Sequence, residues 1–441
     1  MSRRRKPLPT ETVETNIESL SHDGRGVTHI DGKTIFIDGA LPGERVKFLY
    51  SKIHRKFDEA YTVEVLDASP IRTTPLCSSF GICGGCSLQH MQADAQIINK
   101  QQILLDNLWH IGKVKPAEIL APLTSEHWGY RRKARMGAKY VKGKQRVLVG
   151  FREKRKPYLA ELENCEVLHP SVGKHLQELS TLIMGLSCYD QIPQIEVAVG
   201  DEITALVFRV LTECSETDKQ ALIEFAQKYN FAIYLQPKGP DSVSLLYPEQ
   251  VDLFYVLPEY NIKVHFQPTD FTQVNQTLNI KMVAHAMSLL KPETDDRILE
   301  LFCGLGNFSL PIASTVQELV AVEGEAGLVK RAEENAQVNG LSNVEYHVAN
   351  LEEDNRSMSW LRKQSYNKIF LDPPRSGAAA ILPQLAKTGA NRIVYVSCNP
   401  ATLARDAEIL VHEMGFRLVS AGVMDMFPHT AHVESIALFE K

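Results

Sequence analysis

Apolar and polar residues follow one pattern near the beginning of the chain and another near its end. Between residues 10 and 68, short runs of alternating apolar and polar residues are separated by turn-forming clusters, which is typical of β-strands. These runs lie at residues 13–20, 27–30, 33–37, 45–50 and 59–66. Asp31-Gly32 separates the second run from the third and predicts a hairpin. About five short strands in so few residues predict a small β-barrel over residues 1–69.

The chain from about residue 263 to 441 alternates short apolar runs with helix-like segments. The apolar runs lie at residues 298–302, 318–323, 344–348, 368–372, 393–397 and 435–439. Such alternation predicts an α/β domain with a mostly parallel sheet. Residues 70–262 mix helix-like and strand-like segments, so we expect a central α+β domain there. Its helical stretch within 93–124 could instead pack on the α/β domain.

Charge is distributed unevenly along the chain. The 48 Lys and Arg against 53 Asp and Glu give a net charge of −5, which would argue against a nucleic-acid partner if it were evenly spread. Residues 131–156, however, hold 12 basic residues and one acid, which is +11, so the remainder carries −16. The basic residues alternate with apolar ones, as on a strand pair with one basic face. This segment favours RNA or DNA binding over an ordinary solvated surface.

No apolar segment follows the basic N-terminal arm at residues 2–6, as a signal peptide would require, and no run is long enough to span a membrane. We therefore expect a cytoplasmic protein without a membrane partner, and a monomer.

Three cysteines are clustered in one glycine-rich stretch. Cys77, Cys83 and Cys86 are separated by five and two residues, and Cys165 follows the basic segment. In a reducing compartment, clustered cysteines bind metal more often than they form disulfides. The spacing suits a [4Fe–4S] cluster or a structural zinc ion, and buried inert thiols are the weaker alternative.

A cofactor site is indicated by residues at the ends of successive apolar runs. Gly304-x-Gly306 follows the first run and allows a sharp turn, although a third glycine is missing because residue 309 is Ser. Glu323 lies 17 residues after Gly306 and suits a ribose diol. Asn350 follows the run 344–348, and Asp372 ends the run 368–372. Each alone could be a cap or a turn residue, but their joint order fits an S-adenosylmethionine site.

Cys398 follows the apolar run 393–397 and precedes a helix-like segment, which is a suitable place for a nucleophile. Arg375 or the helix N-terminus could stabilise its thiolate, and a small buried hydrophobe is the alternative reading. Glu434 begins the last run, and His432 is a weaker rival as a base. A thiol, a carboxylate and a methyl donor together fit addition of sulfur to C6 of uracil, methylation of C5 and removal of the C5 proton.

The motifs FTQVNQ, LELFCGLGNFSLP, LDPPRSG, VSCNPATLARD and FPHTAHVES resemble those of the RNA uracil-C5 methyltransferases. The resemblance extends over nearly the whole chain. It implies a Rossmann-like S-adenosylmethionine-dependent domain at 263–441 and a barrel that is similar to an OB-like TRAM domain, an RNA-binding module. The cysteine cluster and the barrel favour the branch that acts on 23S ribosomal RNA.

The resemblance also implies roles for single residues. Cys398 matches the nucleophile and Glu434 the base. The positions that match methyl-donor contacts are Gln273, Phe302, Asn307, Glu323, Asn350 and Asp372. The positions that match ligands of a [4Fe–4S] cluster are Cys77, Cys83, Cys86 and Cys165.

Three alternatives remain open. The same chemistry could act on tRNA or another RNA. An amino-group methyltransferase is less consistent, because such enzymes carry an aromatic residue after D/N-P-P, where this chain has Arg375, and Cys398 would have no role. A non-catalytic RNA-binding protein with an iron–sulfur cluster would leave Cys398 and Glu434 unexplained.

Overall fold

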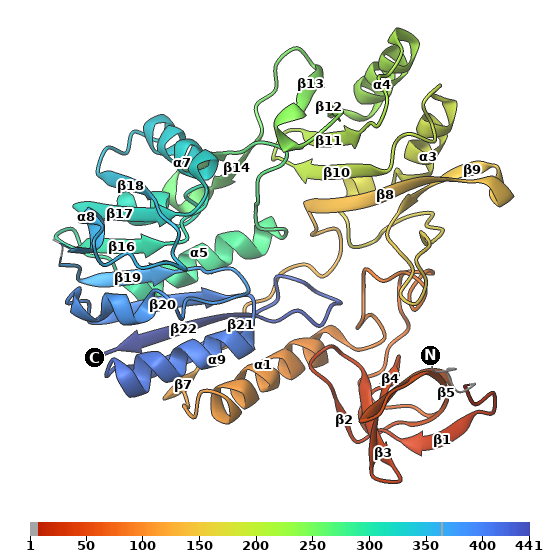
Figure 1. Ribbon diagram of the computed structural model, residues 1–441, viewed down its shortest axis with the longest axis horizontal. Coiled ribbons are helices and arrows are strands. Elements are labelled where there is room, and N and C mark those ends of the chain that lie inside the picture. Colours follow the sequence, from red (N-terminus) through yellow and green to blue (C-terminus); the bar gives the residue numbers. More distant parts are fainter. Residues whose placement is uncertain (1–7, 363–364) are drawn as a thin grey trace, which may run out of the picture. The chain divides into compact units, whose positions relative to one another are not determined.

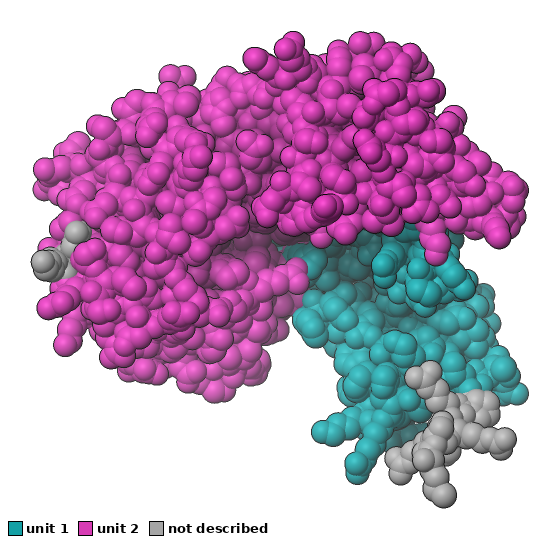
Figure 2. Space-filling view, turned by 45° about the horizontal axis from the view of Figure 1, so that its top comes forward, with its two compact units in different colours: residues 1–99, 151–160, 428–432 teal, residues 100–150, 161–427, 433–441 magenta. Residues whose placement is uncertain are grey.

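The computed structural model describes residues 8–362 and 365–441, which divide into two compact units (Figure 1 and Figure 2). Unit 1 comprises residues 1–99, 151–160 and 428–432, and unit 2 comprises the rest. The chain therefore contributes to unit 1 three times. The basic arm at residues 2–6 lies outside the described residues.

Unit 1 contains a six-stranded sheet in the order β1-β5-β6-β4-β3-β2. Its strands are β1 (Val13–Asn16), β2 (Ser19–Leu20), β3 (Gly26–Ile30), β4 (Lys33–Asp38), β5 (Arg45–Ile53) and β6 (Phe57–Asp67). The predicted hairpin is confirmed, because β3 and β4 pair antiparallel. At its turn Asp31 and Gly32 both have positive φ, 50° and 75°, as a type I′ turn requires.

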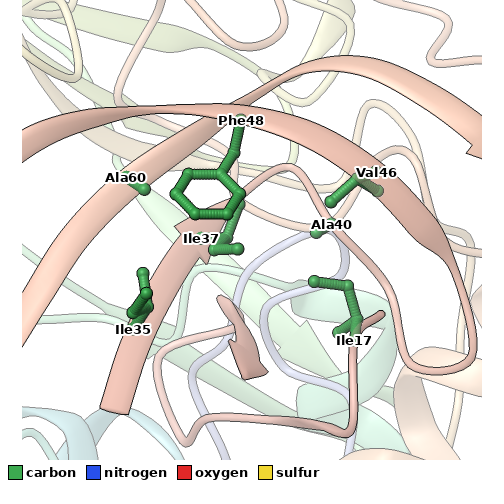
Figure 3. Close-up of a cluster of buried hydrophobic side chains, with 7 residues drawn as sticks. All are labelled: Ile17, Ile35, Ile37, Ala40, Val46, Phe48 and Ala60. Carbon is green, nitrogen blue, oxygen red and sulfur yellow. The ribbon is translucent and has the colours of Figure 1, made fainter. Parts of the chain in front are cut away.

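The apolar side of this sheet encloses a small core (Figure 3). Alternate residues of β4 and β5 point into it, since successive side chains of a strand face opposite sides. The cluster consists of Ile17, Ile35, Ile37, Ala40, Val46, Phe48 and Ala60. All seven side chains are almost fully buried, so the alternating pattern in the sequence corresponds to one continuous core.

The cysteine-containing loop of unit 1 is held by residues distant in sequence. The amide of Gly84 donates to the Arg152 carbonyl at 2.9 Å, and Lys154 donates to Ile82 at 2.7 Å. The amide of Ser87 donates to the carbonyl of His429, also at 2.9 Å. The end of the basic segment is thus hydrogen-bonded to the cysteine loop.

Unit 2 contains a central six-stranded sheet in the order β13-β12-β11-β10-β8-β9. Its strands are β8 (Lys133–Val141), β9 (Arg146–Gly150), β10 (Gln194–Val199), β11 (Thr204–Arg209), β12 (Phe231–Gln236) and β13 (Ser244–Tyr247). The accompanying helices are α2 (Pro170–Gly173), α3 (Leu176–Gly185) and α4 (Glu216–Tyr229). The hairpin β14 (Phe254–Leu257) and β15 (Ile262–His265) follows.

The second sheet of unit 2 has eight strands in the order β18-β17-β16-β19-β20-β22-β21-β7 (Figure 1). They are β7 (Glu118–Ile119), β16 (Arg297–Leu301), β17 (Glu318–Glu323), β18 (Val344–Val348), β19 (Lys368–Leu371), β20 (Arg392–Ser397), β21 (Arg417–Met424) and β22 (Glu434–Glu440). The helices outside the central sheet are α1 (Ala93–His110), α5 (Gln276–Leu290), α6 (Ser309–Ala313), α7 (Ala326–Val338), α8 (Ser359–Arg362) and α9 (Pro400–Glu408).

The predicted parallel arrangement holds for β16 to β20, whereas β22 runs antiparallel to both β20 and β21. A strand that follows its neighbour through a short connection can return only antiparallel, which corrects the expectation for residues 435–439. β7, from the stretch that could pack on this domain, pairs with β21. No helix in the described part of the chain is long and apolar enough to cross a membrane.

Candidate active site

The predicted site residues of the α/β sheet follow the ends of its strands. Phe302 comes directly after β16, Asp372 directly after β19 and Cys398 directly after β20. Glu323 is the last residue of β17, and Asn350 lies two residues beyond β18. Because the carboxyl ends of parallel strands meet at one edge, these residues share the edge at which open α/β sheets bind ligands.

Strand register brings Cys398 and Glu434 together. In the antiparallel pair β20–β22, Ser397 lies opposite Ser435, and the Ser435 hydroxyl donates to the Ser397 carbonyl at 3.1 Å. Cys398 and Glu434 are each the next residue beyond this pair, on facing strand ends. The antiparallel direction of β22 therefore places the start of that strand beside the end of β20.

The electrostatic surroundings of this pair favour the protonated forms. Glu434 is buried, and burial raises the pKa of its carboxyl well above the usual value, with nearby Asp372 adding to the effect. Burial also raises the pKa of the half-buried Cys398 thiol to about 11, again reinforced by Glu434 and Asp372. Burial raises the pKa of Asp372 to about 7.

Arg375 favours the ionised forms of Cys398 and Glu434, as the sequence predicted for the thiolate. Its guanidinium lowers the pKa of both Cys398 and Glu434, but burial and the carboxylates outweigh it. Helix α9 begins two residues after Cys398, and its cap is Asn399, whose side chain accepts from the Ala401 amide at 3.1 Å. The Cys398 thiol thus keeps its proton at neutral pH in the absence of ligands.

The turn after β16 needs backbone conformations that favour glycine. Gly304 and Gly306 have φ of 54° and 95°, and Phe302 is also left-handed at 65°. A Cβ at Gly304 would meet no atom within 4 Å, so this side of the turn is open. The Gly304 amide donates to a carboxylate oxygen of Glu323 at 3.2 Å, and the Gly324 amide donates to the other oxygen at 2.7 Å.

The Asn307 side chain is part of a small amide network that the sequence pattern did not indicate. It exchanges hydrogen bonds of 2.9 and 3.0 Å with the Asn279 side chain, on α5. The Tyr255 hydroxyl, on β14, donates to Asn307 Oδ1 at 2.9 Å. Two elements, α5 and β14, thereby fix the turn that carries Asn307.

Glu300 is a second residue that sequence reasoning missed. It is almost fully buried in β16, and burial raises the pKa of its carboxyl to about 8, with Asp372 and Glu323 contributing. Glu300, Glu323, Asp372 and Glu434 thus collect at one sheet edge that has Arg375 as a nearby cation. Such an arrangement favours a positively charged ligand.

Two of the predicted site residues are less closely tied to this group. Asn350 is exposed; its side chain donates to Glu353 at 2.8 Å and accepts from the Glu352 amide at 3.0 Å, as a turn residue does. Gln273 is half-buried in the segment before α5, next to the buried Val274. His432, the rival base, belongs to unit 1, whereas Cys398 and Glu434 belong to unit 2.

The four cysteines predicted to bind a metal come from both units. Cys77, Cys83 and Cys86 lie half-buried in one loop of unit 1, and the Gly85 amide points at Cys83 Sγ at 3.4 Å. Cys165 belongs to unit 2. Within residues 8–362 and 365–441, no group of three or more Cys, His, Asp or Glu side chains is arranged to hold a metal ion. The donor chemistry of the four thiols fits a thiolate-bound cluster.

Acidic side chains form ion pairs with many of the basic residues at 131–156 and offset their charge. Lys144 and Arg146 both pair with Glu161, which lies outside the segment. Further pairs are Arg132–Asp201, Arg135–Glu196, Lys154–Asp38, Arg155–Asp38 and Lys156–Glu153. The +11 counted along the sequence is therefore not the charge that the folded surface presents.

Comparison with known proteins agrees with this architecture. A family model described as tRNA (Uracil-5-)-methyltransferase matches residues 99–441, and a TRAM domain model matches residues 8–60. One similar solved structure is the crystal structure of Pyrococcus abyssi tRNA (uracil-54, C5)-methyltransferase in complex with S-adenosyl-L-homocysteine. The similarity covers 97% of this chain and 100% of that chain. Its TM-score is 0.74 at 21% identity, which shows that the fold is that of a methyltransferase.

Curated relatives define the family more narrowly. The Xanthomonas axonopodis pv. citri protein named 23S rRNA (uracil(1939)-C(5))-methyltransferase RlmD is 52% identical, with 100% of both chains covered. The Methylococcus capsulatus protein of the same name is 51% identical over 99% of both chains. The chain belongs to the RNA (uracil-C5)-methyltransferase family, in its RlmD branch, and is an enzyme. The expected resemblance is thereby confirmed, and so is the TRAM domain.

Proposed function

We propose that this enzyme transfers a methyl group from S-adenosylmethionine to C5 of a uridine in 23S ribosomal RNA, forming 5-methyluridine. The observation that carries the proposal is the facing pair of Cys398 and Glu434 at the ends of β20 and β22. The naming of relatives about 52% identical over the full chain supports the ribosomal substrate.

The methyl donor is proposed to bind along the ends of β16 to β19. Its sulfonium charge suits the four carboxylates near this edge, and the open side of Gly304 leaves room for a ligand. Glu323 would accept from the ribose hydroxyls. The other proposed contacts are Gln273, Phe302, Asn307, Asn350 and Asp372.

The chemistry would use Cys398 and Glu434 in succession. Carbon 5 of uracil is a weak nucleophile until sulfur adds to C6, when the electrons of the C5–C6 double bond become available at C5. Bound S-adenosylmethionine supplies an electrophilic methyl group. The Glu434 carboxylate then removes the C5 proton, the C6–sulfur bond breaks, and Cys398 leaves as a thiolate. The product regains its C5–C6 double bond.

Both side chains must lose a proton before they can act. In the free protein, burial holds the pKa of Cys398 at about 11 and the pKa of Glu434 well above its usual value. A cation bound beside Asp372 would lower both pKa values, since an opposite charge favours the ionised forms. Donor binding would therefore prepare the thiol and the base.

The cysteine cluster is proposed to bind iron and sulfide as a [4Fe–4S] group through Cys77, Cys83, Cys86 and Cys165. Support comes from four thiols of suitable spacing and from the Gly85 amide that points at Cys83 Sγ. Anaerobic purification should give a brown protein that contains iron and acid-labile sulfide. A colourless protein that contains zinc would reject this assignment.

The direct test is methylation with labelled donor. Unmodified 23S RNA and tRNA are incubated side by side with the enzyme and methyl-tritiated S-adenosylmethionine, and the nucleosides are separated after digestion. Label in 5-methyluridine from 23S RNA alone is expected. Label in 5-methyluridine from tRNA would show that tRNA is a substrate, which is the first alternative named above. Label on an exocyclic amine would contradict the mechanism.

A further inference from the structure

A buried carboxylate in α9 connects the two segments that carry Cys398 and Arg375. Asp406 is fully buried and has no part in the chemistry described above. Its Oδ2 accepts from the Tyr395 hydroxyl and the Ala378 amide, both at 2.6 Å. Its Oδ1 accepts from Nε and Nη2 of Arg405 at 2.9 and 2.7 Å. All four bonds are made within unit 2.

These bonds join the strand that leads to Cys398 with the segment that follows Arg375. Tyr395 lies on β20, three residues before Cys398, and Ala378 lies three residues after Arg375. Arg405 also donates to the Ser376 carbonyl at 2.8 Å. The Asn399 side chain, beside Cys398, donates to the Arg375 carbonyl at 3.1 Å. The segment after Asp372 is thus tied repeatedly to the turn that carries Cys398.

The close approach requires glycine between these ties. Gly377 has a φ of 76°, and a Cβ there would lie 2.5 Å from Arg405 Nη2 and 2.6 Å from Asp406 Oδ2. No real side chain tolerates such distances, so the backbone of the LDPPRSG motif fits directly against the carboxylate and guanidinium of VSCNPATLARD. This fit gives a physical reason for the two motifs to occur together.

The segment held in this way carries Arg375, a cation that opposes the negative surroundings of the thiol. The charged groups acting on Cys398 are Glu434 on β22, Asp372 at the end of β19, and Arg375. The two carboxylates disfavour a thiolate, and Arg375 favours it. The benefit from Arg375 falls off with distance, so it depends on where the segment is fixed.

We propose that Asp406, with Arg405, is a positioning residue that holds the Arg375 segment beside the Cys398 turn and so keeps the guanidinium in place for the attacking thiolate. This inference deepens the proposed function and rests on it, because the position of Arg375 matters only if Cys398 attacks the base.

The test measures thiolate formation in the free full-length protein, without RNA or methyl donor. The rate of Cys398 alkylation by iodoacetamide is followed against pH by mass spectrometry of its peptide. A lost neighbouring charge shifts a pKa by about one unit or more, so Asp406→Asn should slow alkylation about tenfold well below the pKa of the thiol. Arg375→Gln should slow it equally, and the double variant should show no further loss.

Asp296→Asn is the matched control. Asp296 is also a buried carboxylate of this domain, bound to Lys368 at the other end of β19 and to the Glu293 amide. It should lower the melting temperature and leave the alkylation profile unchanged. If Asp406→Asn does not fold, Tyr395→Phe removes one of the four bonds and should give a smaller shift in the same direction.

The inference is overturned if the folded variants alkylate as fast as the wild type or faster, or if the effects of Asp406→Asn and Arg375→Gln add. The proposed function fails separately. Absence of label in 5-methyluridine would remove the reaction, while a shared shift in alkylation would still establish that Asp406 positions Arg375.

Discussion

At the scale of single residues, the site combines the proposed nucleophile Cys398 and the proposed base Glu434, and both are protonated at rest. Burial does most of this, and the carboxylates of Glu434 and Asp372 reinforce the effect on the pKa of Cys398. Such a site reacts slowly with stray electrophiles until a cation enters it, because little of the thiol is ionised. The same carboxylates that suppress the thiolate would bind the sulfonium, so substrate binding and activation are linked by charge.

Glu434→Gln should separate addition from release. Cys398 could still add and C5 could still accept a methyl group, but the C5 proton would stay, so a protein–RNA adduct should accumulate with ordinary uridine. We expect turnover to fall about 100- to 10,000-fold, as for loss of a general base. The adduct is detected as a labelled band on a denaturing gel.

Cys398→Ala is the companion variant and should give no adduct, even with 5-fluorouridine RNA. Near-normal turnover by Glu434→Gln would show that another group, such as His432, removes the proton.

Glu300 makes stability depend on pH. Its pKa is about 8 in the folded protein, against 4.5 as the ordinary value. The folded state therefore keeps a proton that the unfolded chain loses, and the contribution present below pH 4.5 is lost as pH rises toward 8. The slope is about 1.4 kcal/mol per pH unit. Urea unfolding at several pH values should show a decline in stability, and Glu300→Gln should make it shallower by about this slope, while Asp372 and Glu434, whose pKa values are also raised, maintain the rest.

Glu408→Gln, which changes an exposed carboxylate on α9, is the control and should keep the decline. An equal slope in wild type and Glu300→Gln would contradict the role of Glu300.

At the scale of elements, a buried ion pair between Lys100 and Asp425 binds helix α1 to the residue that follows β21. Lys100 is fully buried, and its Nζ donates to Asp425 at 2.6 Å and to the Phe427 carbonyl at 3.0 Å. Asp425 directly follows Met424, which lies opposite Glu434 in the β21–β22 pairing. The helix thereby supports the strand end on which the proposed base depends.

Lys100→Met should leave Asp425 buried without its partner, at a cost of about 3–5 kcal/mol in the free energy of unfolding. The double change Lys100→Met with Asp425→Asn should cost less, because the buried charge is gone. Chemical denaturation measures both. Lys330→Met removes an exposed lysine that pairs with Glu334 and should change stability by less than about 0.5 kcal/mol; a loss as large as that of Lys100→Met would reject the argument.

The sequence was sufficient to predict most strands of the unit 1 sheet and of the eight-stranded sheet, and the residues at their ends, because period-two alternation and apolar runs are local. It did not predict that β21 exists, that β22 runs antiparallel, or that Cys398 and Glu434 lie opposite each other. Strand register is fixed by pairing between distant segments, which a local pattern does not contain. Asp406 and Lys100 were missed for the same reason. A charged residue in a helix looks solvated until its partner, here Tyr395 or Asp425, is known.

At the scale of the whole molecule, ion pairs redistribute charge within each unit. Glu161 offsets Lys144 and Arg146, whereas the exposed Lys139 forms no ion pair with any described residue. Counterion release depends on the charges that reach phosphate, so the count along the sequence overstates the RNA-facing charge.

Lys139→Gln should therefore weaken RNA binding and reduce the slope of log affinity against log salt by about one, whereas Lys144→Gln should change it less. Filter binding of an RNA fragment at several salt concentrations measures both slopes. Equal losses for the two variants would show that ion pairing with Glu161 does not remove Lys144 from the RNA-binding charge.

Unit 1 is built from three separate segments of the chain, and this has a consequence for the order in which it folds during synthesis. The Ser87 amide binds the carbonyl of His429, and the Gln96 side chain accepts from the His429 amide across 333 positions of sequence. On the ribosome, the small sheet of β1 to β6 can form early, since its residues emerge first. The cysteine loop has to wait for residues 428–432, which leave the ribosome long afterwards. The order of translation thus delays completion of unit 1 until nearly all of unit 2 has been made.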